Sequence, residues 1–222
     1  MSVEQRKSIA VLGGTGNEGG GLALRWAKAG YAVIIGSRYA EKAEQAAAAI
    51  REKTGGTASG KTMLDAANAA DIVVLSVPYG GQQSTALAVA EALAGKILID
   101  VTVPLMPPKV GRVQLPAGGS AVAALQDVLG TGVKVVSAFQ NISAHHLAHL
   151  DHEVECDVLV CSDDRDAADE VVGLARAIGL AAWDAGPLAN SAASEALTSI
   201  LITLNRRYKL DGAGIRITGI TA

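Results

Sequence analysis

One glycine-rich turn near the amino terminus restricts the fold of this chain more than any other feature. An apolar run, Ile9–Leu12, ends at a pair of glycines. The G-x-G-x-x-G spacing of dinucleotide-binding turns is then met by Gly14, Gly16 and Gly19. In that pattern the first glycine permits the tight turn, the second lets backbone N–H groups approach a pyrophosphate, and the third lets the next helix pack closely. Residues 8–38 are therefore predicted to form a strand, a glycine turn, a helix and a second strand, with a diphosphate at the helix amino terminus.

The end of the second predicted strand indicates which dinucleotide binds. NAD-binding sites carry an Asp or Glu about 20 residues after the glycines, where it accepts hydrogen bonds from the ribose hydroxyls. This chain has Gly36-Ser37-Arg38 at that place, without a carboxylate. A guanidinium can form two hydrogen bonds with a 2′-phosphate, and a serine hydroxyl can donate a third. We predict NADP as the cofactor, with Lys42 as a second cation; the alternative is that Ser37-Arg38 only caps an exposed strand end.

Composition excludes several classes of protein. The 222 residues carry a net charge of −3 without a basic stripe, which argues against a nucleic-acid partner. No apolar run approaches the roughly 20 residues that span a bilayer, and the amino terminus has no signal-peptide core, so we expect a cytoplasmic protein and no membrane partner. Cys156 and Cys161 are too few for a zinc knuckle and are expected to lie buried in a strand.

Strands alternate with helical segments along most of the chain, which predicts an α/β fold of the Rossmann type with a doubly wound, mostly parallel sheet. We expect residues 1–153 to form the NADP-binding domain and residues 154–222 a smaller lobe that completes the substrate cleft. Helices are predicted at 41–53, 63–69, 120–129, 164–178 and 191–208, and further strands at 57–60, 71–77, 96–100, 133–139, 157–161, 181–184 and 215–218.

Two connections between the predicted strands are candidates for the substrate cleft. Pro78-Tyr79 follows a buried strand at its carboxyl end, where ligands bind in open α/β sheets. Tyr79 either lies along the nicotinamide or is a plain surface residue in a turn. Residues 101–119 contain four prolines and no evident element, so they form a lid or only elaborate the surface. The apolar helix 191–208 either closes the cleft or pairs across a dimer.

All four histidines lie in residues 140–152. If that segment were one helix, His145, His149 and His152 would share a face at i, i+4 and i+7, a spacing that suits a transition metal. No H-E-x-x-H pattern accompanies them, so we expect no metal site. We expect instead a hydrated helix whose histidines, including His146, face solvent, a ligand phosphate or a partner subunit.

Several of these stretches together resemble one family, the F420-dependent NADP reductases. The resemblance is carried by GGTGN followed by GSR, by VVLSVPYG, by VVSAFQNISAHHLAHLD, and by DAGPLANSAASEALTSILI. It covers nearly the whole chain and implies a Rossmann domain with a small carboxyl-terminal lobe, as a homodimer. The implied activity is hydride transfer between NADP and the deazaflavin ring of coenzyme F420.

The resemblance also implies a set of site residues. Those expected to bind NADP are Gly14, Thr15, Gly16, Asn17, Glu18, Ser37, Arg38, Lys42, Pro78, Tyr79 and Ala138. Apart from the resemblance, Gln140, Asn141 and Ile142 are our candidates for positioning the two rings. Hydride transfer between stacked rings needs orientation more than acid–base groups, so no catalytic triad is expected.

The chain departs from the family pattern at two places. Glu18 stands where the family often has an apolar residue, and a carboxylate beside a pyrophosphate is unfavourable unless it points outward. Residues 140–143, Gln-Asn-Ile-Ser, replace the His-Thr-Ile-Pro of archaeal members. This change leaves open two alternatives: an NADPH-dependent reductase of another small-molecule acceptor (flavin, quinone, metal ion, carbonyl or imine), or a non-catalytic NADP-binding regulator.

Overall fold

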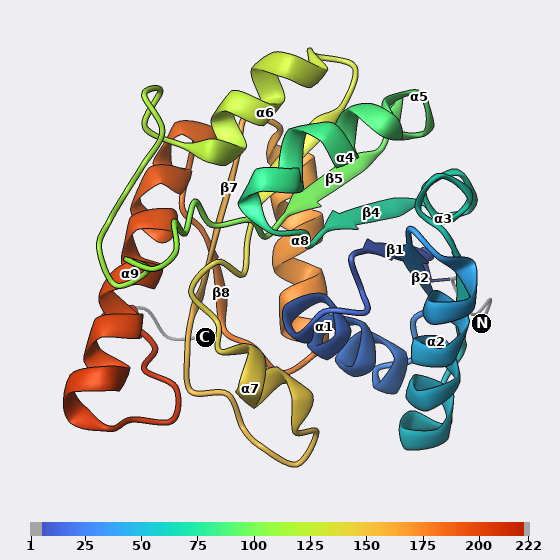
Figure 1. Cartoon of the computed structure of the whole chain (residues 1–222), viewed down its shortest axis with the longest axis horizontal. Coiled ribbons are helices and arrows are strands. Elements are labelled where there is room, and N and C mark those ends of the chain that lie inside the picture. The colour runs from blue at the N-terminus through green and yellow to red at the C-terminus, as the bar shows by residue number, and fades with distance from the viewer. Residues whose placement is uncertain (1–5, 220–222) are drawn as a thin grey trace.

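Eight strands form one sheet, and the order of the strands sets where the cleft lies (Figure 1). The computed structural model describes residues 6–219. Neighbouring strands pair in parallel except β6 and β7, which are antiparallel. Across the sheet the order is β3 (Ala58–Thr62), β2 (Val33–Ser37), β1 (Ile9–Leu12), β4 (Ile72–Leu75), β5 (Ile97–Asp100), β6 (Lys134–Ser137), β7 (Val158–Ser162) and β8 (Ala182–Asp184). The predicted doubly wound, mostly parallel sheet is confirmed, and its order reverses between β1 and β4.

Helices cover both faces of this sheet, as Figure 1 shows. One core layer is completed by α1 (Asn17–Lys28), α2 (Ala40–Thr54), α7 (Ala144–Ala148) and α8 (Arg165–Ala177). The other is completed by α3 (Met63–Ala69), α4 (Gln82–Ala88), α5 (Ala90–Leu93) and α6 (Ala121–Leu129). The long helix α9 (Ser191–Tyr208) packs against α6 and β7. Short 3₁₀ turns occur at Tyr79–Gly81 and Leu188–Asn190.

The apolar runs read as buried strands because each strand serves two core layers. In β1, Ile9 and Val11 pack in the layer of α1 and α2, whereas Ala10 and Leu12 pack in the layer of α3. Successive side chains of a strand point to opposite faces, so a strand covered on both sides needs apolar residues at every position. The same alternation in β4 places both strands at the centre of the sheet.

Three sequence predictions differ from the structure. The strand expected at 215–218 is wrong, because that segment makes one backbone bond, from Asp157 N to Ile215 O (2.8 Å), while Ile217 N donates to the Asp157 side chain. Cys156 precedes β7 and only Cys161 lies in it, although both thiols are buried. The histidine segment is helical only over α7, which ends at Ala148. His149 and His152 lie beyond the helix, so they do not share a helical face with His145.

The division expected at residue 153 falls in the loop between α7 and β7, and β7 and β8 extend the same sheet. The division into two domains therefore remains a proposal. Residues 1–5 and 220–222, which the prediction included, lie outside the described residues. Within residues 6–219, no helix has the length and apolar character that a membrane crossing would need.

Candidate functional site

The glycine turn after β1 is built by close packing against Ser76, at the carboxyl end of β4. Gly13 has φ +87°, and a Cβ there would lie 2.4 Å from Ser76 O. A Cβ on Gly19 would lie 2.1 Å from Ser76 Oγ, so the third glycine does allow α1 to approach the sheet. The left-handed conformation belongs to Gly13, not to Gly14, to which the sequence pattern assigned the tight turn. The left-handed turn therefore lies one residue before the glycine to which the pattern assigned it, and the binding role of the motif stays a prediction.

The amino terminus of α1 presents backbone donors at this turn. Gly16 is the N-cap, and no side chain accepts hydrogen bonds from the first N–H groups of the helix. Thr15, Gly16 and Asn17 are exposed. Free N–H groups and the helix dipole together favour an anion at such a position. The predicted pyrophosphate position therefore has the required geometry.

A cavity of about 550 Å³ lies beside the turn, and we call it the arginine cavity. The predicted Ser37, Arg38 and Lys42 all line it, at the end of β2 and the start of α2. Lys42 Nζ lies 5.3 Å from the centre of the Tyr39 ring. The rest of the wall consists of Gly13, Thr15, Gly16, Tyr39, Met63, Ser76, Val77, Pro78, Ser84 and Thr85. Two cations and several hydroxyls at one end suit a phosphate monoester.

A second cavity, of about 640 Å³, adjoins the first; we call it the lid cavity because residues of the long loop 101–119 line it. Gly16, Ser76, Val77 and Pro78 line both cavities, so the two are adjacent, and we call them together the groove. Its other lining residues are Asn17, Glu18, Tyr79, Val101, Thr102, Val103, Leu105, Pro107, Val110, Phe139, Gln140, Asn141, Ile142, Ser143, Ala144, Thr198, Leu201, Ile202, Asn205 and Ala213.

Two amide side chains are fixed in orientation at the lid cavity. Gln140 Nε2 donates to Asp100 O (2.8 Å), and Asn141 Nδ2 donates to Asp157 O (2.8 Å). Both partners are carbonyl oxygens, so the NH₂ groups must face them. Gln140 Oε1 and Asn141 Oδ1 are buried without a partner. Each amide therefore offers one unused acceptor to a ligand, since buried acceptors are rarely left unpaired.

Phe139 holds these amides in place through an uncommon backbone conformation. Its φ is +73°, which is rare for a bulky residue. The ring packs edge-on against Trp26 of α1, with centroids 5.8 Å apart, and is 1% exposed. The packed ring overcomes the local strain, which directs the chain from β6 into residues 140–143. Strain of this kind is concentrated at binding sites.

Glu18 turns its carboxyl group inward, toward the lid cavity. Its Oε1 atom is buried without a partner, as is the Oγ atom of Ser76 across the turn. Burial raises the pKa of Glu18 to about 8. The side chain is therefore mostly a neutral carboxylic acid at pH 7, and a neutral acid avoids the repulsion expected between a carboxylate and a pyrophosphate.

Helix α9 forms the far wall of the lid cavity and carries contacts to the lid and to α6. Thr203 Oγ1 donates to Gly111 O (2.9 Å), and Ser199 Oγ donates to Arg112 O (3.3 Å). Buried Glu195 accepts hydrogen bonds from Ser120 Oγ, Ala121 N and Val122 N at 2.6, 2.8 and 3.2 Å, so it caps α6. Burial raises the pKa of Glu195.

The groove brings together most of the predicted residues but not all. Ala138 is fully buried in the core and lines neither cavity, and Gly14 lines a smaller cavity between α1 and α2. Ser76 and Thr102 were not predicted from the sequence. Helix 191–208 was a candidate to close the cleft, but none of its lining residues was predicted individually. These residues follow no local motif, although Ser76 lies near the end of the strand predicted at 71–77, two residues before Pro78.

The sequence and the structure resemble known proteins over nearly their whole length. A family model described as coenzyme F420-dependent NADP oxidoreductase matches residues 8–104. An F420-dependent NADP reductase from Methanocaldococcus jannaschii is 46% identical over 221 residues, covering 96% of this chain and 98% of that protein. One from Methanothermobacter thermautotrophicus is 44% identical, covering 96% and 95%. The crystal structure of a candidate F420-dependent NADP-reductase from Arthrobacter has a TM-score of 0.80 at 27% identity, covering 96% and 100%.

Proposed function

The chain belongs to the family of F420-dependent NADP reductases, and from this premise we propose that it transfers a hydride between NADP(H) and coenzyme F420. The observation that carries the proposal is the groove, in which the adjacent arginine cavity and lid cavity share Gly16, Ser76, Val77 and Pro78. A dinucleotide can extend from one cavity into the other across the amino terminus of α1. The two ends of the groove would then recognise different parts of the substrates.

The arginine cavity would select NADP over NAD. Arg38 and Lys42 are exposed cations that line the cavity with the hydroxyl of Ser37. An adenosine 2′-phosphate would be bound by the guanidinium through charge-assisted hydrogen bonds. The N–H groups at the start of α1 would bind the pyrophosphate, which stands between the two cavities.

The lid cavity would hold the nicotinamide next to the deazaflavin. Apolar side chains from the lid, including Val103 and Leu105, and from α9, including Leu201 and Ile202, would exclude water. The free amide oxygen of Gln140 or Asn141 would accept a hydrogen bond from a ring substituent, and Ile142 would pack against a ring face. NADPH supplies the hydride, and orientation of the two rings within this cavity would provide most of the rate.

The test is turnover of purified protein with NADPH and each acceptor in turn. We expect oxidation of NADPH with F420, measured at the absorbance bands of both, and little turnover with FMN or FAD at equal concentration. NADH in place of NADPH should give a much lower kcat/KM. Turnover with FMN but not with F420 would favour another acceptor, which the changed residues 140–143 would then explain. Binding of NADPH without turnover of any acceptor would indicate a regulator.

A homodimer is a further part of the proposal. Ile200 and Tyr208 of α9 and Leu210 after it are 49%, 62% and 49% exposed, an unusual number of large apolar side chains for one surface segment. A second copy of the chain would cover them. Light scattering during size-exclusion chromatography should give twice the monomer mass, and Ile200→Glu should lower it. A monomer at micromolar concentration would contradict this part alone.

A further inference from the structure

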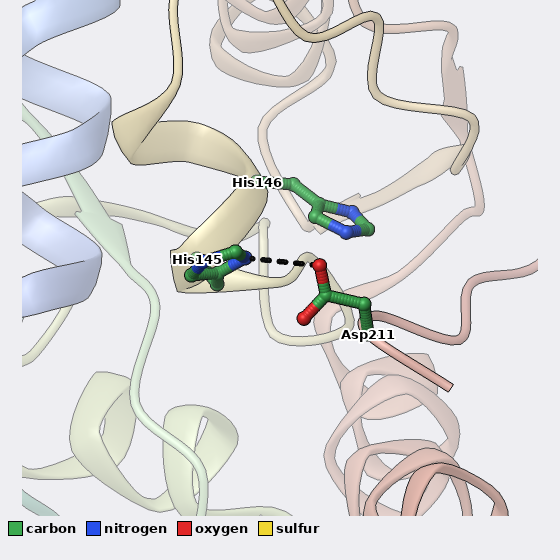
Figure 2. Close-up of side chains that lie close together, drawn as sticks. All are labelled: His145, His146 and Asp211. Carbon is green, nitrogen blue, oxygen red and sulfur yellow. Dashed lines mark ion pairs between the residues drawn. The ribbon is translucent and has the colours of Figure 1, made fainter. Parts of the chain in front are cut away.

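Two histidines and one aspartate from separate segments meet at the surface beside the lid cavity. His145 Nδ1 lies 3.5 Å from Asp211 Oδ2. One ligand atom from each of His145, His146 and Asp211 lies within 4.8 Å of the other two. Figure 2 shows both imidazole rings beside the Asp211 carboxylate, with the histidines on α7 and Asp211 after α9. We propose that these three side chains bind one divalent transition-metal ion of the zinc class.

The distances and the donor atoms both suit such an ion. Two atoms that each lie about 2.0–2.1 Å from a tetrahedral zinc ion are about 3.3 Å apart, close to the separation of His145 and Asp211. Two imidazoles and one carboxylate are a donor set that leaves a fourth position for water. Calcium and magnesium prefer oxygen ligands and would be disfavoured. The side chains of His145 and Asp211 are 58% and 80% exposed, so an ion has free access.

The backbone that carries the histidines is held by one buried arginine. Arg25 of α1 is 8% exposed and donates four hydrogen bonds to this segment. Its acceptors are the carbonyl oxygens of His146, Leu147, His149 and His152, at 3.0, 3.0, 2.7 and 2.8 Å. A segment fixed in this way loses little conformational freedom when its side chains bind an ion. The site is therefore largely formed before the metal arrives.

Each proposed histidine ligand also has a neighbour that orients its ring. His145 Nε2 lies 3.3 Å from His149 Nε2. If that hydrogen bond uses the proton of His145 Nε2, the lone pair of Nδ1 faces Asp211, as in metal sites where the second ring nitrogen donates to a neighbour. The ring of His146 packs on His152, with centroids 4.2 Å apart. It also lies on the backbone of Gly212, where a Cβ would approach its Cε1 atom to 2.3 Å.

Asp211 lies in a turn whose backbone is fixed by α9. The helix ends at Lys209 in a left-handed conformation, with φ +56°. Asn205 accepts from Lys209 N and Leu210 N (3.1 Å) on its backbone oxygen and from Ala213 N on its side chain (2.7 Å). The carboxylate is thus presented from a defined turn. This group of ligands differs from the His145, His149 and His152 set that the sequence spacing suggested.

The ion would connect two segments that both line the lid cavity. Ser143 precedes α7, Ala144 is its first residue, and Ala213 lies two residues after Asp211; all three line the cavity. Binding would fix their separation and stabilise that wall of the cavity. This role goes beyond hydride transfer and needs neither NADPH nor F420, so it can be tested without them.

The experiment uses tag-free, full-length protein treated with EDTA and dialysed, then titrated with Zn²⁺ by calorimetry and with Co²⁺ by visible absorption. We expect one ion per chain, a cobalt spectrum typical of low coordination number, and a higher melting temperature with zinc. His145→Ala and Asp211→Asn should each weaken binding at least ~10-fold, the size of loss seen when groups at metal sites are removed. Asp151→Asn is the matched control, because Asp151 is an exposed carboxylate in the loop that follows α7. This variant should bind zinc as the wild type does.

Two results would overturn the proposal. Absence of one-to-one binding at micromolar zinc would exclude a site. Loss of binding in His149→Ala with unchanged binding in Asp211→Asn would instead assign the ion to the His145–His149 pair. Failure of F420 turnover would leave this site unaffected, whereas loss of zinc binding would leave NADPH binding unaffected.

Discussion

The arginine cavity and the lid cavity share four residues, yet they are assembled in different ways. Most of the arginine cavity comes from two consecutive strand–helix units, with Ser37, Arg38 and Lys42 close together in the chain. The lid cavity is formed by segments as distant as Asn17 and Ala213. A motif can describe the first, because its geometry follows from local chain direction. The second exists only when the lid, residues 140–143 and α9 pack together, so mutations should separate the two regions.

The largest expected effect is at the turn that both cavities share. Gly13→Ala adds a Cβ 2.4 Å from Ser76 O at a residue with φ +87°. Backbone strain of about 1–3 kcal/mol and overpacking of about 1–3 kcal/mol together predict a loss of roughly 2–6 kcal/mol in the free energy of unfolding. Urea denaturation measures it. Gly55→Ala is the control, since Gly55 has φ +67° with no atom within 4 Å, and should show the strain alone.

Equal losses in the two glycine variants would mean that the contact with Ser76 relaxes without cost. The shared turn would then not be held by close packing between β1 and β4. Normal NADPH affinity in Gly13→Ala would also contradict this interpretation, because the turn is expected to form part of the NADPH site.

The next effect tests the lid side separately. Glu195→Ala removes the acceptor for Ser120 Oγ and for the N–H groups of Ala121 and Val122, all of them buried. Donors left buried without a partner predict a loss of about 3 kcal/mol in the free energy of unfolding. Of the two cavities, α9 lines only the lid cavity, where F420 and only the nicotinamide end of NADPH would bind. The KM for F420 should therefore rise by a larger factor than the Kd of NADPH. Glu195→Gln, which keeps one acceptor oxygen, is the control and should lose less. A larger change in NADPH affinity than in F420 KM would contradict the separation of the two regions.

The same contrast explains how much could be predicted from the sequence. The sheet, the long connection 101–119 and helix 191–208 followed from apolar runs, prolines and periodicity. The proposed NADP end, the arginine cavity, was predicted from Gly36-Ser37-Arg38 at the end of β2. The predicted strand at 215–218 failed because the β-type residues there bond to Asp157 through one backbone bond and one side-chain bond, not to a neighbouring strand.

The rest of the site depends on tertiary contacts that have no local signal. The free oxygens of Gln140 and Asn141 are defined only once Asp100 and Asp157 accept from their NH₂ groups. The proposed metal ligands are 65 residues apart, from His146 to Asp211, and the backbone of the histidine segment is held by Arg25 of α1. Residue spacing alone suggested a different set of histidines. Sequence motifs therefore located the first cavity and only indicated the second.

Nucleotide specificity sharpens the comparison at the arginine cavity. Arg38→Ala should weaken NADPH binding by about 2–3 kcal/mol, the value of a charge-assisted hydrogen bond, and should leave NADH binding nearly unchanged. Calorimetric titration with both nucleotides measures the difference. The thermal stability of the variant should match the wild type, because Arg38 is exposed. Equal losses of affinity for NADPH and NADH would show that the adenosine 2′-phosphate does not bind in the arginine cavity.

The smallest expected effect concerns Glu18, which lies in the first turn of α1 and lines the lid cavity. Burial raises the pKa of Glu18 from 4.5 to about 8. Between these values the folded protein keeps a proton that the unfolded chain has released, so the free energy of unfolding falls as pH rises, and it levels off above pH 8. Relative to Glu18→Gln, which cannot ionise, the wild type should lose about 2 kcal/mol from pH 6 to pH 8. Urea denaturation of both proteins at the two pH values isolates this group from the others. Parallel curves for the two proteins would show that the carboxyl group is hydrated, and the lid cavity would then reach solvent at the point where the two regions join.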